Sequence, residues 1–191
     1  MIDHRDKPVI ALMMSPIDAE FHAKQLKPHA QEAAFVHIKD LEDLDKVTAS
    51  GRPTRLISFC SPHIVSKELL ERIRYNAVNF HPGPPERPGY MPAPFALHEN
   101  DEDFGATFHK MLPKVDTGSI IDVTRFKIDP HNMTLAEVEM EAYKALLTMV
   151  VRHAAGLADI DFNFAPAGID WTGRKTTRVD LAAIGFVKPA G

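Results

Sequence analysis

Two kinds of hydrophobic pattern alternate along the first 82 residues of this chain. Short continuous apolar runs are followed by stretches in which apolar residues recur every three or four positions, and this predicts strands alternating with helices. Such an order indicates a parallel sheet covered by helices. The runs VIALMM and LISF are typical of strands buried on both faces. The predicted strands are 8–15, 35–39, 55–60 and 77–82, and the predicted helices are 18–35, 40–50 and 66–75.

The pattern changes after residue 90, where a helix over 92–100 and a long helix over 134–157 flank two strands, 105–112 and 119–128. Thr134 and Glu137 form a predicted capping box at the start of the long helix, and Gly156 is its predicted end. We therefore expect an α/β domain over residues 1–157. The polar, turn-rich segment 158–191 is expected to be a C-terminal extension packed on the surface of that domain.

Composition narrows the functional classes. The chain has 191 residues, of which 45% are apolar and 25% charged, as in ordinary soluble domains. Its net charge of -4 is spread along the chain, which argues against a nucleic-acid partner. Cys60 is the single cysteine, so no internal disulfide can form, and neither a signal pattern nor a membrane-length apolar run is present. We expect a cytoplasmic protein with no membrane partner.

Known ligand motifs are also missing. The ten histidines are scattered rather than set at metal-ligand spacing, so we expect no metal site. The first predicted strand is followed by SPIDAEF, without the glycines of a dinucleotide-binding loop or a P-loop.

The segment VNFHPGPPERPG, residues 78–89, holds the first candidate site. Residues i and i+2 of a strand point to the same face, so Asn79 and His81 are expected to project side by side. In a parallel sheet they lie at the carboxyl edge, where open α/β sheets bind ligands. The prolines that follow stiffen the adjoining loop. The alternative is structural, with His81 closing a strand and Asn79 bonding to neighbouring backbone groups.

Asp116, in the segment KVDTGSII, is a third candidate. It follows a strand in a turn whose Gly118 can take a positive φ, and it can bring a carboxylate back to the same edge. An amide, an imidazole and a carboxylate together suit acyl transfer, because the imidazole moves protons and the donors stabilise an oxyanion. Asp-Thr-Gly is also a good turn sequence. An aspartic-protease site would need a symmetric dimer and would leave Asn79 and His81 unexplained.

The arrangement of Asn-x-His, a proline-rich loop and, 35 positions after the histidine, Asp-Thr-Gly resembles the folate-dependent formyltransferase family. That family includes glycinamide ribonucleotide, methionyl-tRNA and sugar N-formyltransferases. The resemblance is specific between Leu56 and Ile121, through FCSPHIV, NFHPG and FGATFHKMLPKVDTGSII. The segment IDWTGRKTTRVDL is a weaker echo of later family segments. The resemblance implies a Rossmann-like formyltransferase fold, with a mostly parallel central sheet and helices on both faces.

The same resemblance implies that the chain uses 10-formyltetrahydrofolate and that Asn79, His81 and Asp116 match the family's catalytic triad. By this analogy the pterin pocket is lined by SFCSP, residues 58–62, and by the turn around Val115. The named cofactor-binding candidates are Ser58, Phe59, Cys60 and Val115. For Phe59 and Cys60 the alternative is simple burial at a strand end. A homodimer is a family-level expectation.

Two departures from the family pattern affect the acceptor. The chain has GPPE at 83–86 where relatives commonly carry Ser-Leu-Leu-Pro, and it lacks the usual glycine after the first strand. The resemblance therefore implies no substrate contacts for that loop and no phosphate or nucleotide subsite. A transfer-RNA acceptor is not expected, because the chain lacks both basic charge and the additional domain that methionyl-tRNA formyltransferases use.

The hypothesis is transfer of a formyl group to the amine of a small molecule. Asn79 and protonated His81 would hold the oxyanion, while His81 and Asp116 would manage the proton. The alternatives are a hydrolase that releases formate and a folate-binding protein without turnover. Two further features are interpreted as structural: His109 as a strand histidine, and Trp171 with GRKTTR, residues 173–178, as a solvated tail rather than a contact for an anionic acceptor or folate glutamates.

Overall fold

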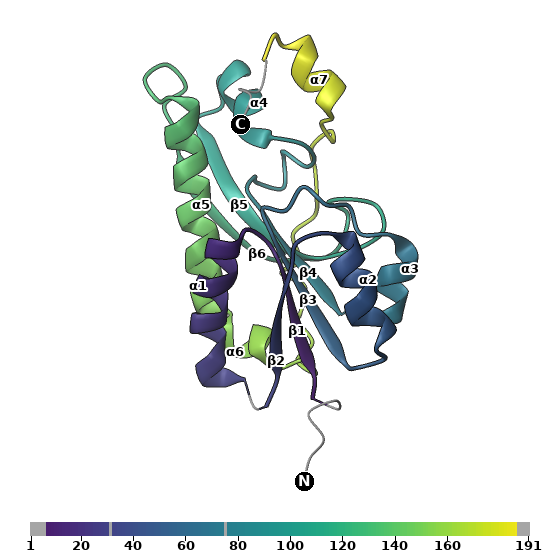
Figure 1. Cartoon of the computed structure of the whole chain (residues 1–191). Helices are drawn as coiled ribbons and strands as arrows, with labels where there is room; N and C mark the ends of the chain where they lie inside the picture. The colour runs from purple at the N-terminus through teal and green to yellow at the C-terminus, as the bar shows by residue number, and fades with distance from the viewer. Residues whose placement is uncertain (1–6, 31, 75, 187–191) are drawn as a thin grey trace.

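One six-stranded sheet forms the centre of the molecule, with the strand order β2-β1-β3-β4-β5-β6 (Figure 1). The computed structural model describes residues 7–30, 32–74 and 76–186. Strands β2, β1, β3 and β4 are parallel, whereas β5 runs antiparallel to both β4 and β6. The strands are β1 (Val9–Met13), β2 (Ala34–Ile38), β3 (Thr54–Phe59), β4 (Ala77–His81), β5 (Asp103–Lys110) and β6 (Ile120–Lys127).

Helices cover both faces of this sheet (Figure 1). One face is packed against α1, α5 and α6, and the other against α2 and α3. The short helix α4 joins α5 and the first residues of β5 in a smaller apolar cluster. The helices are α1 (Pro16–Leu26), α2 (Leu41–Ala49), α3 (Lys67–Arg72), α4 (Pro92–His98), α5 (Leu135–Arg152), α6 (Ala154–Ala158) and α7 (Arg178–Ala183).

Strand alternation decides which side chains reach which face. Val78 and Phe80 of β4 lie in the cluster with α1 and α5, whereas Ala77 lies in the cluster with α2 and α3. Because side chains two residues apart share a face, Asn79 and His81 project on the side of Ala77. The candidate site therefore lies on the sheet face opposite the long helix α5.

Two predicted helices have different limits in the structure. The predicted helix 18–35 is α1, which ends at Leu26 and continues as a 3-10 turn, Lys27–His29, before β2 begins at Ala34. Pro28 explains this end, because it has no N–H to donate to the carbonyl four residues earlier and its ring crowds that carbonyl. The helix predicted over 66–75 is α3, Lys67–Arg72, and residue 75 lies outside the described residues.

The predicted helix 134–157 is divided at His153 into α5 and α6. Its capping box is present: the Glu137 N–H donates to Thr134 Oγ1 at 3.3 Å, and the Thr134 N–H donates to the Glu137 carboxylate at 2.7 Å. At the other end Arg152 and His153 both bond to the Asp122 carboxylate of β6, which fixes the end of α5 on the sheet.

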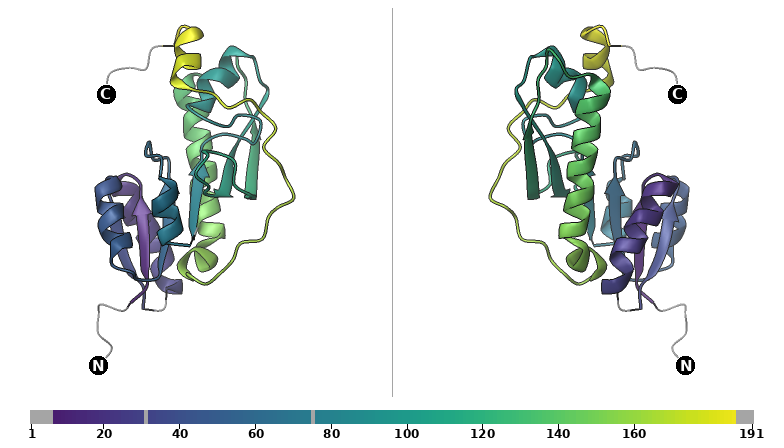
Figure 2. Two further views of the ribbon diagram at one scale, coloured as in Figure 1. Left: turned by 90° about the vertical axis from the view of Figure 1, so that its right-hand side faces the viewer. Right: turned by 90° about the vertical axis from the view of Figure 1, so that its left-hand side faces the viewer.

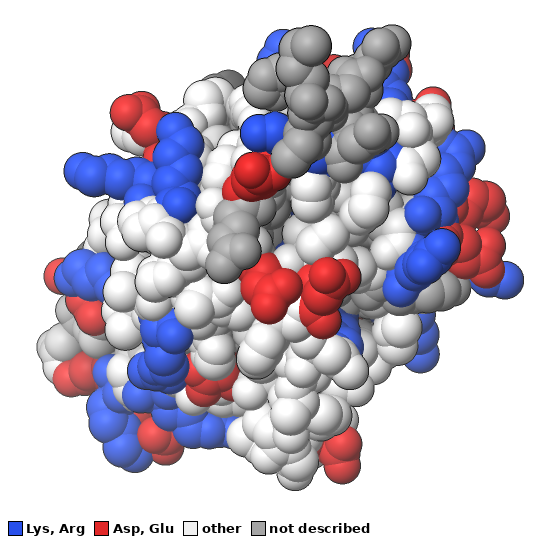
Figure 3. All heavy atoms as spheres, turned by 90° about the horizontal axis from the view of Figure 1, so that it is seen from below, with Lys and Arg blue, Asp and Glu red and all other residues white. Residues whose placement is uncertain are grey.

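The chain after α6 runs along the outside of the molecule towards α7 (Figure 2). Most of residues 158–186 are exposed, and they include the short helix α7, which the sequence pattern does not predict. Acidic and basic side chains are interspersed over the end of the molecule seen in Figure 3. Within the described residues, no helix is long and apolar enough to cross a bilayer.

A buried arginine ties β3 to the segment after α6. Arg55 is 2% exposed, and its guanidinium donates to Asn76 Oδ1 and to the carbonyl oxygens of Gly156, Ile160 and Phe162. Burial lowers its pKa to about 10. The guanidinium also lies 5.4 Å from the centre of the Phe164 ring.

We expect Arg55→Ala to lower the free energy of unfolding by about 3 kcal/mol, because Asn76 Oδ1 and three backbone carbonyl oxygens lose their donor. Arg55→Lys keeps the charge but not the planar fork, so an intermediate loss is expected. Urea denaturation at pH 7 measures both. A loss below about 1 kcal/mol for the alanine variant would contradict this role.

Candidate active site

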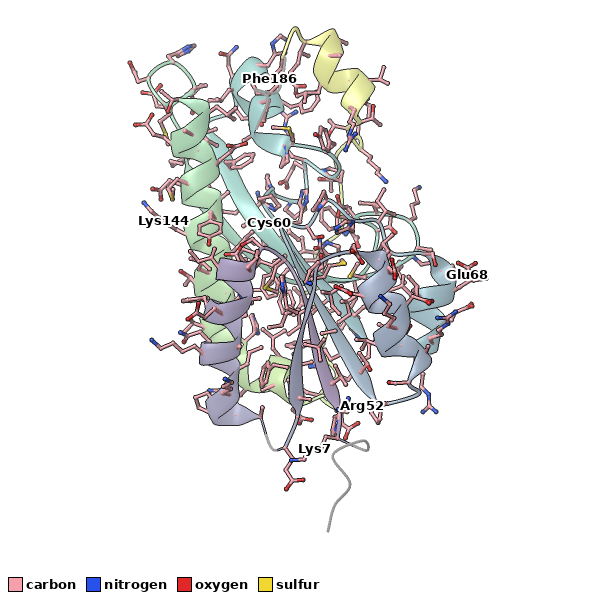
Figure 4. All side chains as sticks on the ribbon, viewed as in Figure 1. Lys7, Arg52, Cys60, Glu68, Lys144 and Phe186 are labelled. Atoms are coloured by element: carbon pink, nitrogen blue, oxygen red, sulfur yellow. The ribbon has the colours of Figure 1, made fainter. Side chains whose placement is uncertain are left out.

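The site is built at the carboxyl end of β4, where His81 is the last strand residue and Asn79 lies two positions earlier. Asn79 is half-buried, and the His81 side chain is 5% exposed. Figure 4 marks this end of the sheet with Cys60, which follows β3, while Lys7 and Arg52 lie at the opposite end. The two residues thus lie at the edge predicted from the alternation of β4.

Asp116 reaches His81 from the turn between β5 and β6. Its carboxylate Oδ2 lies 3.7 Å from His81 Nδ1, and its side chain is 2% exposed. The positive φ expected at Gly118 is instead at Asp116, with φ of 51°. Gly118 has a different function: a Cβ there would lie 1.8 Å from the Lys110 carbonyl oxygen. The turn therefore packs directly on the end of β5, which only glycine permits.

His109 of β5 is a fourth polar member of the site. Its Nε2 lies 3.1 Å from Asn79 Nδ2 and 3.4 Å from Asp116 Oδ1. Its Nδ1 lies 2.8 Å from the Lys110 carbonyl oxygen and so carries a hydrogen, because a carbonyl only accepts. In the neutral imidazole Nε2 is then an acceptor, to which the Asn79 amide donates. The second amide hydrogen of Asn79 remains for a ligand.

The tautomer of His81 follows from the same argument. Its Nε2 lies 2.9 Å from the Arg87 carbonyl oxygen and therefore carries a hydrogen. In the neutral ring the lone pair is on Nδ1, the nitrogen that faces Asp116. Asp116 thus lies between two imidazoles whose other nitrogens are bonded to backbone carbonyls, so a proton taken up by either ring would lie on the nitrogen that faces the carboxylate.

Burial and the neighbouring charges shift the pKa values of His81 and Asp116 in opposite directions. Burial lowers the pKa of His81 below its ordinary value, although the adjacent Asp116 carboxylate raises it. Burial also raises the pKa of Asp116, but His81, His109 and the Gly89 N–H outweigh this and lower it to about 2. At neutral pH the site therefore holds a carboxylate beside a neutral His81, which can accept a proton.

The proline-rich loop, residues 82–91, holds the site through its backbone. The Gly89 N–H donates to Asp116 Oδ2 at 2.7 Å, and the Arg87 carbonyl holds His81. The Arg87 side chain fixes the loop, since it donates to both oxygens of Asp101 at 2.8 and 2.7 Å. A Cβ at Gly83 would lie 2.7 Å from His81 Nε2, so the loop packs closely against the imidazole.

The four predicted cofactor-binding residues have different surroundings. Cys60 is exposed at the end of β3, with φ of 49°, and Val115 is half-buried beside Asp116. Ser58 is 3% exposed and pairs with Asn79 in the sheet register. Phe59 lies in the core, where its ring packs against His22, Phe80 and Tyr143. Phe59 is 1% exposed, so its side chain is part of the core in this structure.

Sequence reasoning underestimated two site neighbours, His109 and Trp171. The Trp171 ring centre lies 5.7 Å from that of His81 and 5.0 Å from that of His109, so this residue is not part of a merely solvated tail. His109 pairs with Asn79 across the antiparallel strands β5 and β4, which brings the two side chains together. Among the described residues, no group of three or more His, Cys, Asp or Glu side chains is arranged to hold a metal ion.

Residues 21–151 match the family model described as formyl transferase. The chain belongs to this family. A curated relative, the methionyl-tRNA formyltransferase of Bdellovibrio bacteriovorus, is 29% identical over 134 residues, which cover 68% of this chain and 41% of the relative. The chain therefore spans less than half the length of that relative.

Solved structures share its Rossmann-like formyltransferase fold. A sugar N-formyltransferase from a Shewanella species has a TM-score of 0.76 at 17% identity, covering 97% of this chain and 82% of that one. The formyltransferase PseJ from Anoxybacillus kamchatkensis, solved with UDP-4,6-dideoxy-4-formamido-L-AltNAc and tetrahydrofolate, has a TM-score of 0.73 at 19% identity, covering 92% and 88%. These likenesses confirm the predicted fold class.

Proposed function

We propose that this chain transfers a formyl group from 10-formyltetrahydrofolate to the amine of a small-molecule acceptor. The observation that carries the proposal is the buried Asp116 carboxylate between His81 and His109, with the Asn79 amide alongside. Membership of the formyl transferase family supports the reaction class. The tetrahydrofolate bound to PseJ supports a folate donor.

The residues at the carboxyl end of β4 fit such a donor. A formyl oxygen needs hydrogen-bond donors, and Asn79 has an amide hydrogen left for one. When bound, the folate supplies the formyl carbon as an activated amide. Exposed Cys60 and half-buried Val115 adjoin the site, and we propose that they and the backbone at Ser58 and Phe59 contact the pterin.

In the proposed reaction the acceptor nitrogen forms a bond to the formyl carbon, and the bond from that carbon to the folate nitrogen breaks. Asn79 donates to the formyl oxygen as negative charge develops there. His81 Nδ1 takes the proton from the attacking amine and returns it to the departing folate nitrogen. Asp116, 3.7 Å away, stabilises the imidazolium while it exists. His81 therefore begins neutral, rather than protonated as the sequence hypothesis has it, because burial lowers its pKa.

A turnover assay tests the proposal. The protein is incubated with 10-formyltetrahydrofolate and a panel of amines, including amino sugars, nucleotide-linked amines and hydroxylamines. We expect an amine product heavier by one formyl group and an equal amount of tetrahydrofolate, both measured by mass spectrometry. Formate produced at the same rate without amine would instead indicate a hydrolase. Tight folate binding without product from any amine would indicate a binding protein.

A further inference from the structure

The segment 171–177, here called the strap, crosses the candidate site from the C-terminal extension. The N–H groups of Thr172 and Gly173 donate to the Pro85 carbonyl oxygen at 3.2 and 3.4 Å. Thr176 is 5% exposed. Its N–H donates to the Pro88 carbonyl oxygen at 3.0 Å, and its carbonyl oxygen accepts from the Tyr90 N–H at 3.0 Å. The strap is therefore paired with the proline-rich loop, although the two segments are far apart in the sequence.

Trp171 is the strap residue that contacts the site. Its indole lies edge-on to both imidazoles, at interplanar angles of 70° to His81 and 88° to His109. Its Nε1–H donates to the Gly118 carbonyl oxygen at 2.9 Å. One side chain thus contacts both histidines and is bonded to the turn that carries Asp116.

We propose that Trp171 is a positioning residue, whose ring keeps water from one side of the His81–Asp116–His109 group and whose N–H fixes the turn that presents Asp116. The proposal adds the C-terminal extension to a site otherwise built from β4, β5, the proline-rich loop and the turn. The expected effect on kcat rests on the proposed function, whereas the expected effect on the pKa of His81 does not.

Removal of the ring would hydrate His81. The charged and titratable groups that act on His81 are Asp116 on the turn and His109 on β5, while the proline-rich loop contributes the Arg87 carbonyl and the strap contributes only the uncharged indole. Because burial is the largest influence on the pKa of His81 and lowers it, hydration should raise that pKa towards its ordinary value. A phenylalanine would keep most of the cover but lose the bond to Gly118.

The first test uses the wild-type protein, in which Trp171 is the single tryptophan and its fluorescence reports on this site alone. A protonated imidazole in contact with an indole quenches its emission. We expect emission to fall as pH is lowered and His81 takes up a proton, and this step to be lost in His81→Asn. The exposed His131→Asn is the control and should leave the step unchanged. A pH-independent emission would overturn the contact.

The second test compares Trp171→Ala, Trp171→Phe and the control Val179→Ala, whose parent residue is 79% exposed on α7. The His81 imidazole signal, assigned with His81→Asn, is followed by NMR as a function of pH. We expect it to titrate at higher pH in Trp171→Ala and close to wild type in the other two. An unchanged titration in folded Trp171→Ala would overturn the proposal. If Trp171→Ala does not fold, the fluorescence test decides alone.

Kinetics then separate the two proposals. We expect Trp171→Ala to lower kcat by about 10-fold with little change in KM, because the catalytic groups are displaced while the substrate contacts remain. We also expect the pH profile of kcat to move to higher pH. Absence of turnover in every variant and in the wild type would count against the proposed function, while the NMR titration still judges the positioning role. An unchanged or higher kcat in Trp171→Ala would count against positioning.

Discussion

Replacing His81 with asparagine is expected to lower kcat/KM for formyl transfer by about 10³-fold, since general acid-base catalysis by one side chain contributes on this scale. Asparagine keeps a polar group near the Arg87 carbonyl but cannot carry the proton between the amine and the folate nitrogen. Initial rates of tetrahydrofolate formation at saturating donor measure the effect.

The control is His131→Asn, because His131 is exposed in the loop before α5 and should leave the rate at the wild-type value. Thermal unfolding would establish that both variants are folded. A folded His81→Asn enzyme with more than about a tenth of the wild-type kcat/KM would remove His81 from the proton path.

Asp116→Asn is expected to reduce both activity and stability. The carboxylate that stabilises the His81 imidazolium is lost, so kcat/KM should fall by about 10²-fold or more. The pKa of Asp116 is about 2 in the folded protein and 3.8 ordinarily, a depressed value, so the charged form contributes to stability above pH 4. We expect this contribution to disappear as pH falls through the folded pKa of about 2.

Denaturant unfolding of wild type and variant, measured from about pH 2.5 to about pH 7, gives the pH dependence directly. The difference in unfolding free energy should shrink as pH falls towards the folded Asp116 pKa of about 2. Asp103→Asn is the matched control, because Asp103 pairs with Lys127 on the surface and such pairs contribute little. A difference between wild type and Asp116→Asn that does not change with pH would contradict the charge argument.

Much of the fold was accessible from the sequence, because strand and helix patterns depend on local periodicity. The continuous apolar runs became β1 and β3, and the alternation around Asn79 and His81 placed both on one face of β4. The helix capped by Thr134 was predicted from its capping box. Each of these signals lies within a few neighbouring residues, and so a single sequence contains it.

The site could be predicted only in part, because its remaining contacts depend on how distant segments meet. His109 reaches Asn79 through the antiparallel register of β4 and β5, which no local pattern in the sequence specifies. Trp171 arrives along the C-terminal extension, whose polar composition suggested only a solvated tail. Arg55 is another case, since a charged residue in an apolar strand gives no sign of the carbonyls it will bind.

The central claim is that the site of Asn79, His81 and Asp116 acts on a folate-bound formyl group. Calorimetric titration of a non-transferring 10-substituted tetrahydrofolate into wild type and Asp116→Ala tests it most directly. We predict saturable one-to-one binding to wild type, with weaker binding to the variant because Asp116 and its turn border the site. Absence of heat and of saturation with folded wild-type protein would contradict the claim and leave the site without a folate.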